Sequence, residues 1–568
     1  MENYGIRGRL TSATALITTL FLVAGLTGAC GTGDETTSPT TSLPTTTIAP
    51  HAGLPLVSFD TGSFAGSNNC AICHSRLQDE SGNDVSMDVH WRSTMMANAA
   101  RDPYFRAKVS TEIKNAPHLQ EVIEDVCATC HTPMARTQAR VDGTAALLFG
   151  DGFFNVSNDL HKAGIDGVSC VLCHQIQSDG LGSTDTFAGG YIIDTAAVSP
   201  DRLIFSQFED PQQQMMMASS GYKPVTGGHL SESGLCATCH TVITPYIDSN
   251  GEIQGTFPEQ VPYLEWEHSS YPGDKECQTC HMPYADGAAK TANMPPDIDA
   301  KGPFSQHYFV GGNTHMIEIL RDNPDALLVT SSTAHFNATI DRAVQQLENS
   351  TASLSILESG LNGKNLSVTV KVNDHTGHKL PTGFPSRRVW LHLQVLDQNG
   401  KVVFESGKPE SDGTISGNDA DNDIYTYEPH YDVITSADQV QIYEAILHNM
   451  DGAVTHKLLE ASGYSKDNRL LPLGFDKQTA GELFAVRGEA LSDGNFIGGS
   501  DIVTYQIDTS AASGPFTVKV ELLYQSMAYS TIHSILGVNT SQVQEFEGYW
   551  ESSDKLPEII AFTAQEVS

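Results

Sequence analysis

The chain has 568 residues, of which 39% are hydrophobic and 8% aromatic. This length and composition allow two or three globular domains with buried cores. The 68 acidic residues outnumber the 32 basic residues and give a formal net charge of -36. Nucleic acids and anionic lipid headgroups are bound by clustered Lys and Arg. Composition and charge therefore exclude both as partners.

The N-terminus has the features of an export signal over residues 1–29. Arg7 and Arg9 precede an apolar run at residues 13–26, which is too short to span a bilayer and is followed by small residues. The sequence LTGAC, ending at Cys30, resembles a bacterial lipobox, in which the cysteine is acylated and becomes the first mature residue. A simple cleaved signal peptide is the alternative.

Residues 30–53 are predicted to form a linker, because they are rich in Thr, Ser and Pro and have few apolar side chains. Folded structure is expected from about Leu54. Gly31 stands where an inner-membrane lipoprotein would have Asp. We therefore expect an outer-membrane lipoprotein on the periplasmic or the cell-surface side, attached to the membrane through its lipid anchor.

The pattern Cys-x-x-Cys-His occurs five times, at residues 70–74, 127–131, 170–174, 236–240 and 277–281. These motifs contain ten of the eleven cysteines, and the eleventh is Cys30. An exported protein often forms disulfides, but a disulfide framework does not require a histidine after every second cysteine. Structural zinc sites usually pair two Cys-x-x-Cys units or add a spaced histidine pair, so five identical units would leave one unmatched.

Covalent haem attachment explains the spacing in all five motifs. Two thiols separated by two residues can each bond one vinyl group of a porphyrin, and the next histidine then binds the iron. We predict five c-type haems. The thioether residues are Cys70, Cys73, Cys127, Cys130, Cys170, Cys173, Cys236, Cys239, Cys277 and Cys280, and the proximal ligands are His74, His131, His174, His240 and His281.

The motifs are too closely spaced for each haem to have its own protein core. The 212 residues from Cys70 to His281 leave about 42 residues per haem. The haems are therefore expected to pack against one another. A contiguous series of macrocycles provides a path for electrons.

Each iron needs a sixth ligand, and 16 of the 21 histidines lie outside the motifs. His161 stands nine residues before Cys170, and His229 stands seven before Cys236. His307 precedes two glycines that would allow close approach to a macrocycle; His315, nearby, is the weaker candidate. Each is weighed against an ordinary surface or core histidine.

The first haem has several candidate sixth ligands on one expected helix. His90, Met95 and Met96 all follow the first motif, and each could equally be a core residue. Methionine would raise the potential of this haem relative to a second histidine, but the spacing does not choose between them. His118 is a reserve candidate, with a solvent-exposed loop histidine as the alternative.

Beyond residue 350 the chain has no cysteine and alternates apolar with polar residues, which predicts half-buried strands. The alternation is seen at Leu366, Val368, Val370 and Val372; at Val389, Leu391, Leu393 and Val395; and at Phe516, Val518, Val520 and Leu522. Asn399-Gly400 predicts a hairpin turn. An antiparallel β-sandwich is expected. His378 lies in a Gly- and Pro-rich loop at a strand end, where it could reach the haems, whereas His392 is expected to face solvent.

The stretch NDADND at residues 418–423 could bind calcium through Asp419, Asp421 and Asp423. It lacks the glycine and the terminal glutamate of a helix-loop-helix calcium site. An acidic surface loop is the alternative.

The chain resembles multihaem c-type cytochromes with a cytochrome c-552/4-type haem domain, a group related to the tetrahaem cytochrome of ammonia oxidisers. The resemblance extends over residues 66–535 and includes WRSTMMANAARDP, GVSCVLCHQI, FPEQVPYLEWEHSSYPGDKECQTCHMP and GHKLPTGFPSRRVWL. It implies mainly bis-histidine haems, with His161, His229, His307 and His378 at ligand-like positions. Met96 stands where some relatives carry His.

Together these features predict a mostly α-helical and irregular haem-packed domain at residues 54–350, followed by an all-β, sandwich-like domain at residues 351–568. We expect an electron-transfer protein that exchanges electrons with other redox proteins and with an extracellular acceptor such as a metal oxide. One alternative is an oxidoreductase that acts on a small nitrogen or sulfur compound at an open haem, although no Cys-x-x-Cys-Lys motif occurs. Another is a subunit of an extracellular cytochrome filament, which would need a histidine donated across subunits.

Overall fold

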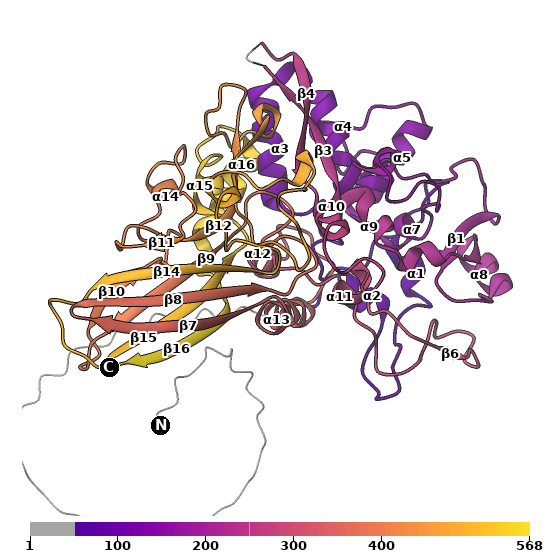
Figure 1. Cartoon of the computed structure of the whole chain (residues 1–568). Coiled ribbons are helices and arrows are strands. Elements are labelled where there is room, and N and C mark those ends of the chain that lie inside the picture. The colour runs from indigo at the N-terminus through magenta and orange to yellow at the C-terminus, as the bar shows by residue number, and fades with distance from the viewer. Residues whose placement is uncertain (1–50, 249) are drawn as a thin grey trace, which may run out of the picture. The chain divides into compact units, whose positions relative to one another are not determined.

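The computed structural model describes residues 51–248 and 250–568 (Figure 1). The predicted signal peptide, the lipidation site Cys30 and nearly all of the predicted linker lie outside these residues. No helix within the described ranges combines the length and the apolar character needed to cross a membrane.

Residues 54–350 form short helices joined by long irregular segments. The helices are α1 (Ser67–Ala71), α2 (Met87–Trp91), α3 (Pro103–Asn115), α4 (Gln120–His131), α5 (Pro133–Val141), α6 (His161–Ile165), α7 (Cys170–Cys173), α8 (Gln213–Ser220), α9 (Ser233–His240), α10 (Pro262–Glu267), α11 (Cys277–His281), α12 (Thr314–Asp322) and α13 (Thr333–Ser350). Asp102 caps α3 by accepting a hydrogen bond from the Phe105 amide, and Pro103 occupies its first turn. The helix expected to carry Met95 and Met96 ends earlier, at Trp91, and both methionines lie in the turns that follow.

Three small sheets interrupt the helices. The strands are β1 (Arg202–Ser206) paired with β2 (Tyr222–Thr226), β3 (Val242–Ile247) with β4 (Ile253–Gln260), and β5 (Ala289–Lys290) with β6 (Ala300–Lys301). The first pair is parallel and the other two are antiparallel. The β3–β4 hairpin directly follows the fourth Cys-x-x-Cys-His motif.

The C-terminal part contains two larger sheets (Figure 1). One has the order β13 (Gly463–Asp467), β12 (Ile442–His448), β9 (Arg388–Leu396), β15 (Phe516–Gln525) and β16 (Glu558–Val567), with β10 (Val402–Ser406) also on β9. The other has the order β11 (Val433–Ile434), β14 (Ser500–Asp508), β8 (Asn365–Asp374) and β7 (Ala352–Asn362). Neighbouring strands are antiparallel except β11 and β14.

The predicted alternation is confirmed. Val370 on β8, Leu391 on β9 and Val520 on β15 are fully buried and belong to one hydrophobic core, to which both sheets contribute. Gly400, with φ of 77°, closes the expected turn between β9 and β10. His392 differs from expectation: it is half-buried and lies between Glu521 and Glu405, at 2.9 and 3.0 Å. Neighbouring strands supply both carboxylates, a cross-strand contact that alternation alone does not reveal.

A second core joins segments from both ends of the chain. Helices α15 (Tyr529–His533) and α16 (Ser541–Ser552), together with the short α14 (Asp419–Asn422), belong to the C-terminal part. Phe546 and Trp550 of α16 pack in one cluster with Tyr104 of α3 and Phe336 of α13. The change from helices to strands near residue 350 is therefore not a boundary between separate cores.

Candidate functional site

Each Cys-x-x-Cys-His motif lies in or beside a helical turn, which places its three functional side chains together. Residues three and four apart share one face of a helix, so both thiols and the histidine project to the same side. The second and fourth motifs form the last turns of α4 and α9, and the fifth forms α11. None of the ten cysteines in the described residues forms a disulfide.

The five motifs face one cavity of about 1650 Å³. All ten motif cysteines and all five motif histidines line it. Protein interiors are close-packed, and their voids rarely exceed the size of a few water molecules. A space of this size, bordered by thiols and histidines in haem-attachment spacing, fits a set of macrocycles.

The thiols show which motifs are neighbours. Three pairs of thiols are close enough to shift each other's pKa: Cys70 with Cys170, Cys130 with Cys239, and Cys236 with Cys277. The thiol contact and burial together raise the pKa of Cys70 well above its usual value. The first motif therefore adjoins the third, and the fourth adjoins both the second and the fifth. Cys173 of the third motif is also close enough to Cys239 to be affected by its charge.

Two serine–carboxylate contacts hold neighbouring motifs together. The backbone amide and hydroxyl of Ser67 donate to the Asp166 carboxylate, at 2.9 and 2.7 Å, and so join α1 to the segment before α7. The amide and hydroxyl of Ser233 donate in the same way to Glu276, at 2.8 and 2.6 Å, and join α9 to the start of α11. In both cases the serine stands three residues before the first cysteine of its motif.

Four of the motif histidines are oriented by backbone carbonyls. Their Nδ1 atoms lie in hydrogen-bonding range of these acceptors: His74 with Thr291, His131 with Ala99, His174 with Phe205 and His281 with Val310. A ring that donates from Nδ1 keeps its Nε2 lone pair available for a metal. Burial also lowers the pKa of His131 and His240 to about 4, which favours the neutral, ligating form.

Two motif histidines are each paired with a histidine from a distant segment. The ring centres of His174 and His307 lie 6.4 Å apart with planes inclined by 13°. The corresponding values for His281 and His378 are 6.2 Å and 21°. Two imidazoles bound to opposite sides of one iron, each at about 2 Å, would place their ring centres about 6 Å apart. His307 and His378 also line the cavity.

The other predicted sixth ligands are less clearly placed. Met95 and Met96 line the cavity, whereas the cavity wall does not include His90, His161 or His229. His90 is buried against Tyr308, with ring centres 4.4 Å apart.

The reserve candidate His118 is exposed. His161 is held through Nδ1 by the Phe153 carbonyl, whereas His229 uses Nε2 toward the Ile176 carbonyl. His315 is buried, contacts Ser553 and lies outside the cavity wall. These roles remain predictions.

A polar patch on the cavity wall was not predicted from the sequence. The Tyr104 hydroxyl, Glu112 Oε2 and Thr244 hydroxyl are buried and have no hydrogen-bond partner among the described residues. Lys108 lies between the first two on α3 and pairs with Glu112 at 2.8 Å. Burial raises the pKa of Glu259, beside Cys127 and Cys130, to about 7. Such groups suit the polar edge of a bound haem. The spacing of residues 104, 108 and 112 on one helix face was the available signal.

No family model matches the chain, and no curated protein matches it. Among solved structures, the chain is similar to a penta-heme cytochrome c552 from Thermochromatium tepidum. The two are 16% identical, the similarity covers 89% of this chain and 100% of that one, and the TM-score is 0.49. Values this low do not establish a shared fold or function, so the assignment rests on the residues of this chain.

Within the described residues, the acidic stretch at residues 418–423 does not bring its aspartates together as a site for calcium. Asp421 is buried in an ion pair with Arg388 at 2.8 Å and also accepts the Ile415 amide at 2.7 Å. Its carboxylate therefore neutralises a buried guanidinium instead of joining Asp419 and Asp423 around an ion. Sequence pattern could not reveal this partner, because Arg388 lies on strand β9, more than 30 residues before Asp421.

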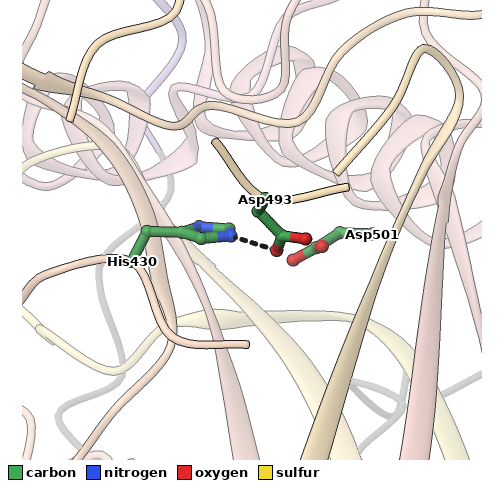
Figure 2. Close-up of side chains that lie close together, drawn as sticks. All are labelled: His430, Asp493 and Asp501. Carbon is green, nitrogen blue, oxygen red and sulfur yellow. Dashed lines mark hydrogen bonds and ion pairs between the residues drawn. The ribbon is translucent and has the colours of Figure 1, made fainter. Parts of the chain in front are cut away.

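Within the described residues, one other group of side chains is close enough together to hold an ion: His430, Asp493 and Asp501 (Figure 2). His430 Nε2 lies 3.0 Å from Asp493, while Gln441 and Asn468 both donate to Nδ1. Tyr443 donates to Asp501 at 2.7 Å. The protein itself satisfies these groups, which identifies a buried structural network of the β part.

Proposed function

We propose that this chain is an exported electron-transfer protein that carries five c-type haems. The observation that carries the proposal is the single cavity onto which all five Cys-x-x-Cys-His motifs open, with two histidine pairs already at the separation that one iron requires. Bound haem would supply one-electron redox chemistry. The protein would set the spacing, axial ligands and burial of the haems.

The contacts between motifs support a branched path for electrons. The fourth motif adjoins the second and fifth through thiols and lies near the third, which adjoins the first. By these contacts the first, second and fifth motifs are the ends of the path. The ends of the path are the natural sites of exchange with partners. An acidic chain favours redox partners with basic docking surfaces.

We further propose that the protein is an outer-membrane lipoprotein, anchored through acylated Cys30 on the periplasmic or cell-surface side. Its partners would be other cytochromes and an extracellular acceptor. The lipobox-like sequence and the polar linker support this location.

Two measurements test the proposal. The mass of the haem-loaded protein should exceed that of the processed polypeptide by five haems. Electron paramagnetic resonance of the oxidised protein should then show low-spin iron at the haems of His174 and His281, and nitrite should leave the spectrum unchanged. A haem-free protein would refute the assignment. A high-spin iron that binds nitrite would favour the oxidoreductase alternative, and paired histidines within one chain already weigh against a filament that needs ligands from another subunit.

A further inference from the structure

The loop at residues 375–384 brings His378 from the C-terminal part of the chain to the fifth motif. The loop connects strands β8 and β9, and it is far from His281 in the sequence. His378 is half-buried, and its ring centre nevertheless lies 6.2 Å from that of His281. Its Nδ1 lies 2.9 Å from the Lys379 carbonyl, which leaves Nε2 available.

One carboxylate from the haem-binding part holds this loop. Glu265, on α10, has no exposed surface. Its Oε2 accepts hydrogen bonds from the Lys379 amide at 3.1 Å and from the Thr382 hydroxyl at 2.5 Å. Lys379 directly follows His378 in the sequence, and Thr382 lies three residues further along the loop. Glu265 therefore fixes the backbone that immediately follows the histidine.

The other oxygen of Glu265 extends this contact into a buried ionic network. Oε1 pairs with Arg469 at 2.9 Å, and Arg469 forms a two-point contact with Asp467, at 2.9 and 2.8 Å. Asp467 also accepts Lys379 Nζ at 2.7 Å. The network thus returns to the loop where it began. Removing one member would leave an uncompensated buried charge, so the network behaves as a unit.

Two aromatic residues beside the fifth motif hold the other side of the loop. The Tyr271 hydroxyl donates to the His375 carbonyl at 2.9 Å. A Cβ on Gly377 would lie 3.4 Å from Trp266 and 3.6 Å from Tyr271, so the loop runs directly along both rings. Glu265, Trp266 and Tyr271 all lie in the segment that ends in Cys277–His281. The segment that carries one axial histidine therefore also positions the other.

From these contacts we propose that Glu265 is a positioning residue, whose carboxylate holds His378 as the sixth ligand of the haem at Cys277–His281. This inference rests on the proposed function, because it requires a haem at that motif. If it holds, one haem receives its sixth ligand only when the haem-binding part and the β part are packed together. A loop released from Glu265 would leave this iron open to small ligands.

The test compares full-length, haem-loaded Glu265→Ala with Glu444→Ala. Glu444 is the matched control, because it also forms a buried ion pair, with Lys466 at 2.9 Å, but makes no contact with the loop. His378→Ala shows the spectrum expected when the ligand is lost. We expect Glu265→Ala, like His378→Ala, to gain one high-spin iron and to bind carbon monoxide at one more haem than the unmodified protein. Added imidazole should restore the low-spin signal in both.

Glu444→Ala should keep the spectrum of the unmodified protein, even if its unfolding temperature falls as far as that of Glu265→Ala. If Glu265→Ala does not fold, Thr382→Val removes one donor to the same carboxylate and should give a smaller gain of high-spin iron. The inference is overturned if Glu265→Ala and Thr382→Val both keep the spectrum of the unmodified protein. It is also overturned if Glu444→Ala gains as much high-spin iron as Glu265→Ala. If the unmodified protein carries no haem, the proposed function itself is refuted.

Discussion

The rings of His174 and His307 face one another at 6.4 Å, although His174 ends the third motif and His307 lies beyond the fifth. The Phe205 carbonyl orients His174 through Nδ1. Burial lowers the pKa of His307 to about 3, with the nearby His174 adding to the effect, so this ring is neutral at ordinary pH. The third haem would thus receive its sixth ligand from a segment made after all five attachment sites.

Replacing His307 by alanine should therefore open the iron of the third haem. The variant His307→Ala should gain one high-spin iron, measured by electron paramagnetic resonance. His307→Met should stay low-spin and raise the potential of one haem, because a thioether ligand favours the reduced iron more than imidazole does. His315→Ala is the control, since His315 is buried against Trp550 and Ser553 outside the cavity wall. An unchanged spectrum in His307→Ala would contradict the ligand assignment.

The fourth motif is expected to be the junction of the electron path. The double variant Cys236→Ala/Cys239→Ala should lose one haem by mass and should slow reoxidation of the remaining haems after rapid reduction. Its two thiols contact the second and fifth motifs, so its removal separates them. Cys70→Ala/Cys73→Ala also removes one haem, but from an end of the path. Equal slowing in both double variants would argue against a junction at the fourth motif.

Features that depend on a local sequence pattern could be predicted from the sequence. The Cys-x-x-Cys-His spacing identified every thiol that lines the cavity, and alternation identified the buried side of β8, β9 and β15. His307 and His378 were chosen as candidates because glycines lie near them in the sequence, and the structure places each of them about 6 Å from a motif histidine. Which motif each would face was not predictable, since that depends on contacts between segments far apart in the chain. The same limit explains why the ion pair of Asp421 with Arg388 and the contact of His392 with Glu521 were not foreseen, since Arg388 lies on β9 and Glu521 on β15.

The ion pairs of His392 should make part of the stability depend on pH. Burial alone would lower the pKa of His392, but Glu521 and Glu405 raise it above the usual value of 6.5. A raised pKa in the folded state means that this contribution is complete below pH 6.5 and is lost as the pH rises through the folded-state value. The effect should be about 1 kcal/mol or less, because both pairs are partly exposed.

The measurement is the difference in urea midpoint between the unmodified protein and His392→Gln at several pH values. The difference should be largest below pH 6.5 and should shrink as the pH rises through the raised pKa of His392. Lys408→Gln serves as the control, because Lys408 pairs with Glu410 on the exposed surface. A difference that stays constant or grows with pH would show that the imidazole is neutral throughout.

Membrane attachment is expected to depend on Cys30, because the lipobox-like sequence LTGAC ends at this cysteine. The chain is too acidic to bind anionic lipids through its surface. Cys30→Ser should therefore move the protein from the membrane fraction to the soluble fraction while the haem spectrum stays the same, because Cys30 lies outside the five motifs. Fractionation with detergent phase separation measures the shift, and radiolabelled palmitate should label the unmodified protein only. A membrane-bound Cys30→Ser variant would refute attachment through this cysteine. An unmodified protein that is soluble and unlabelled would refute the lipid anchor and leave the simple cleaved signal.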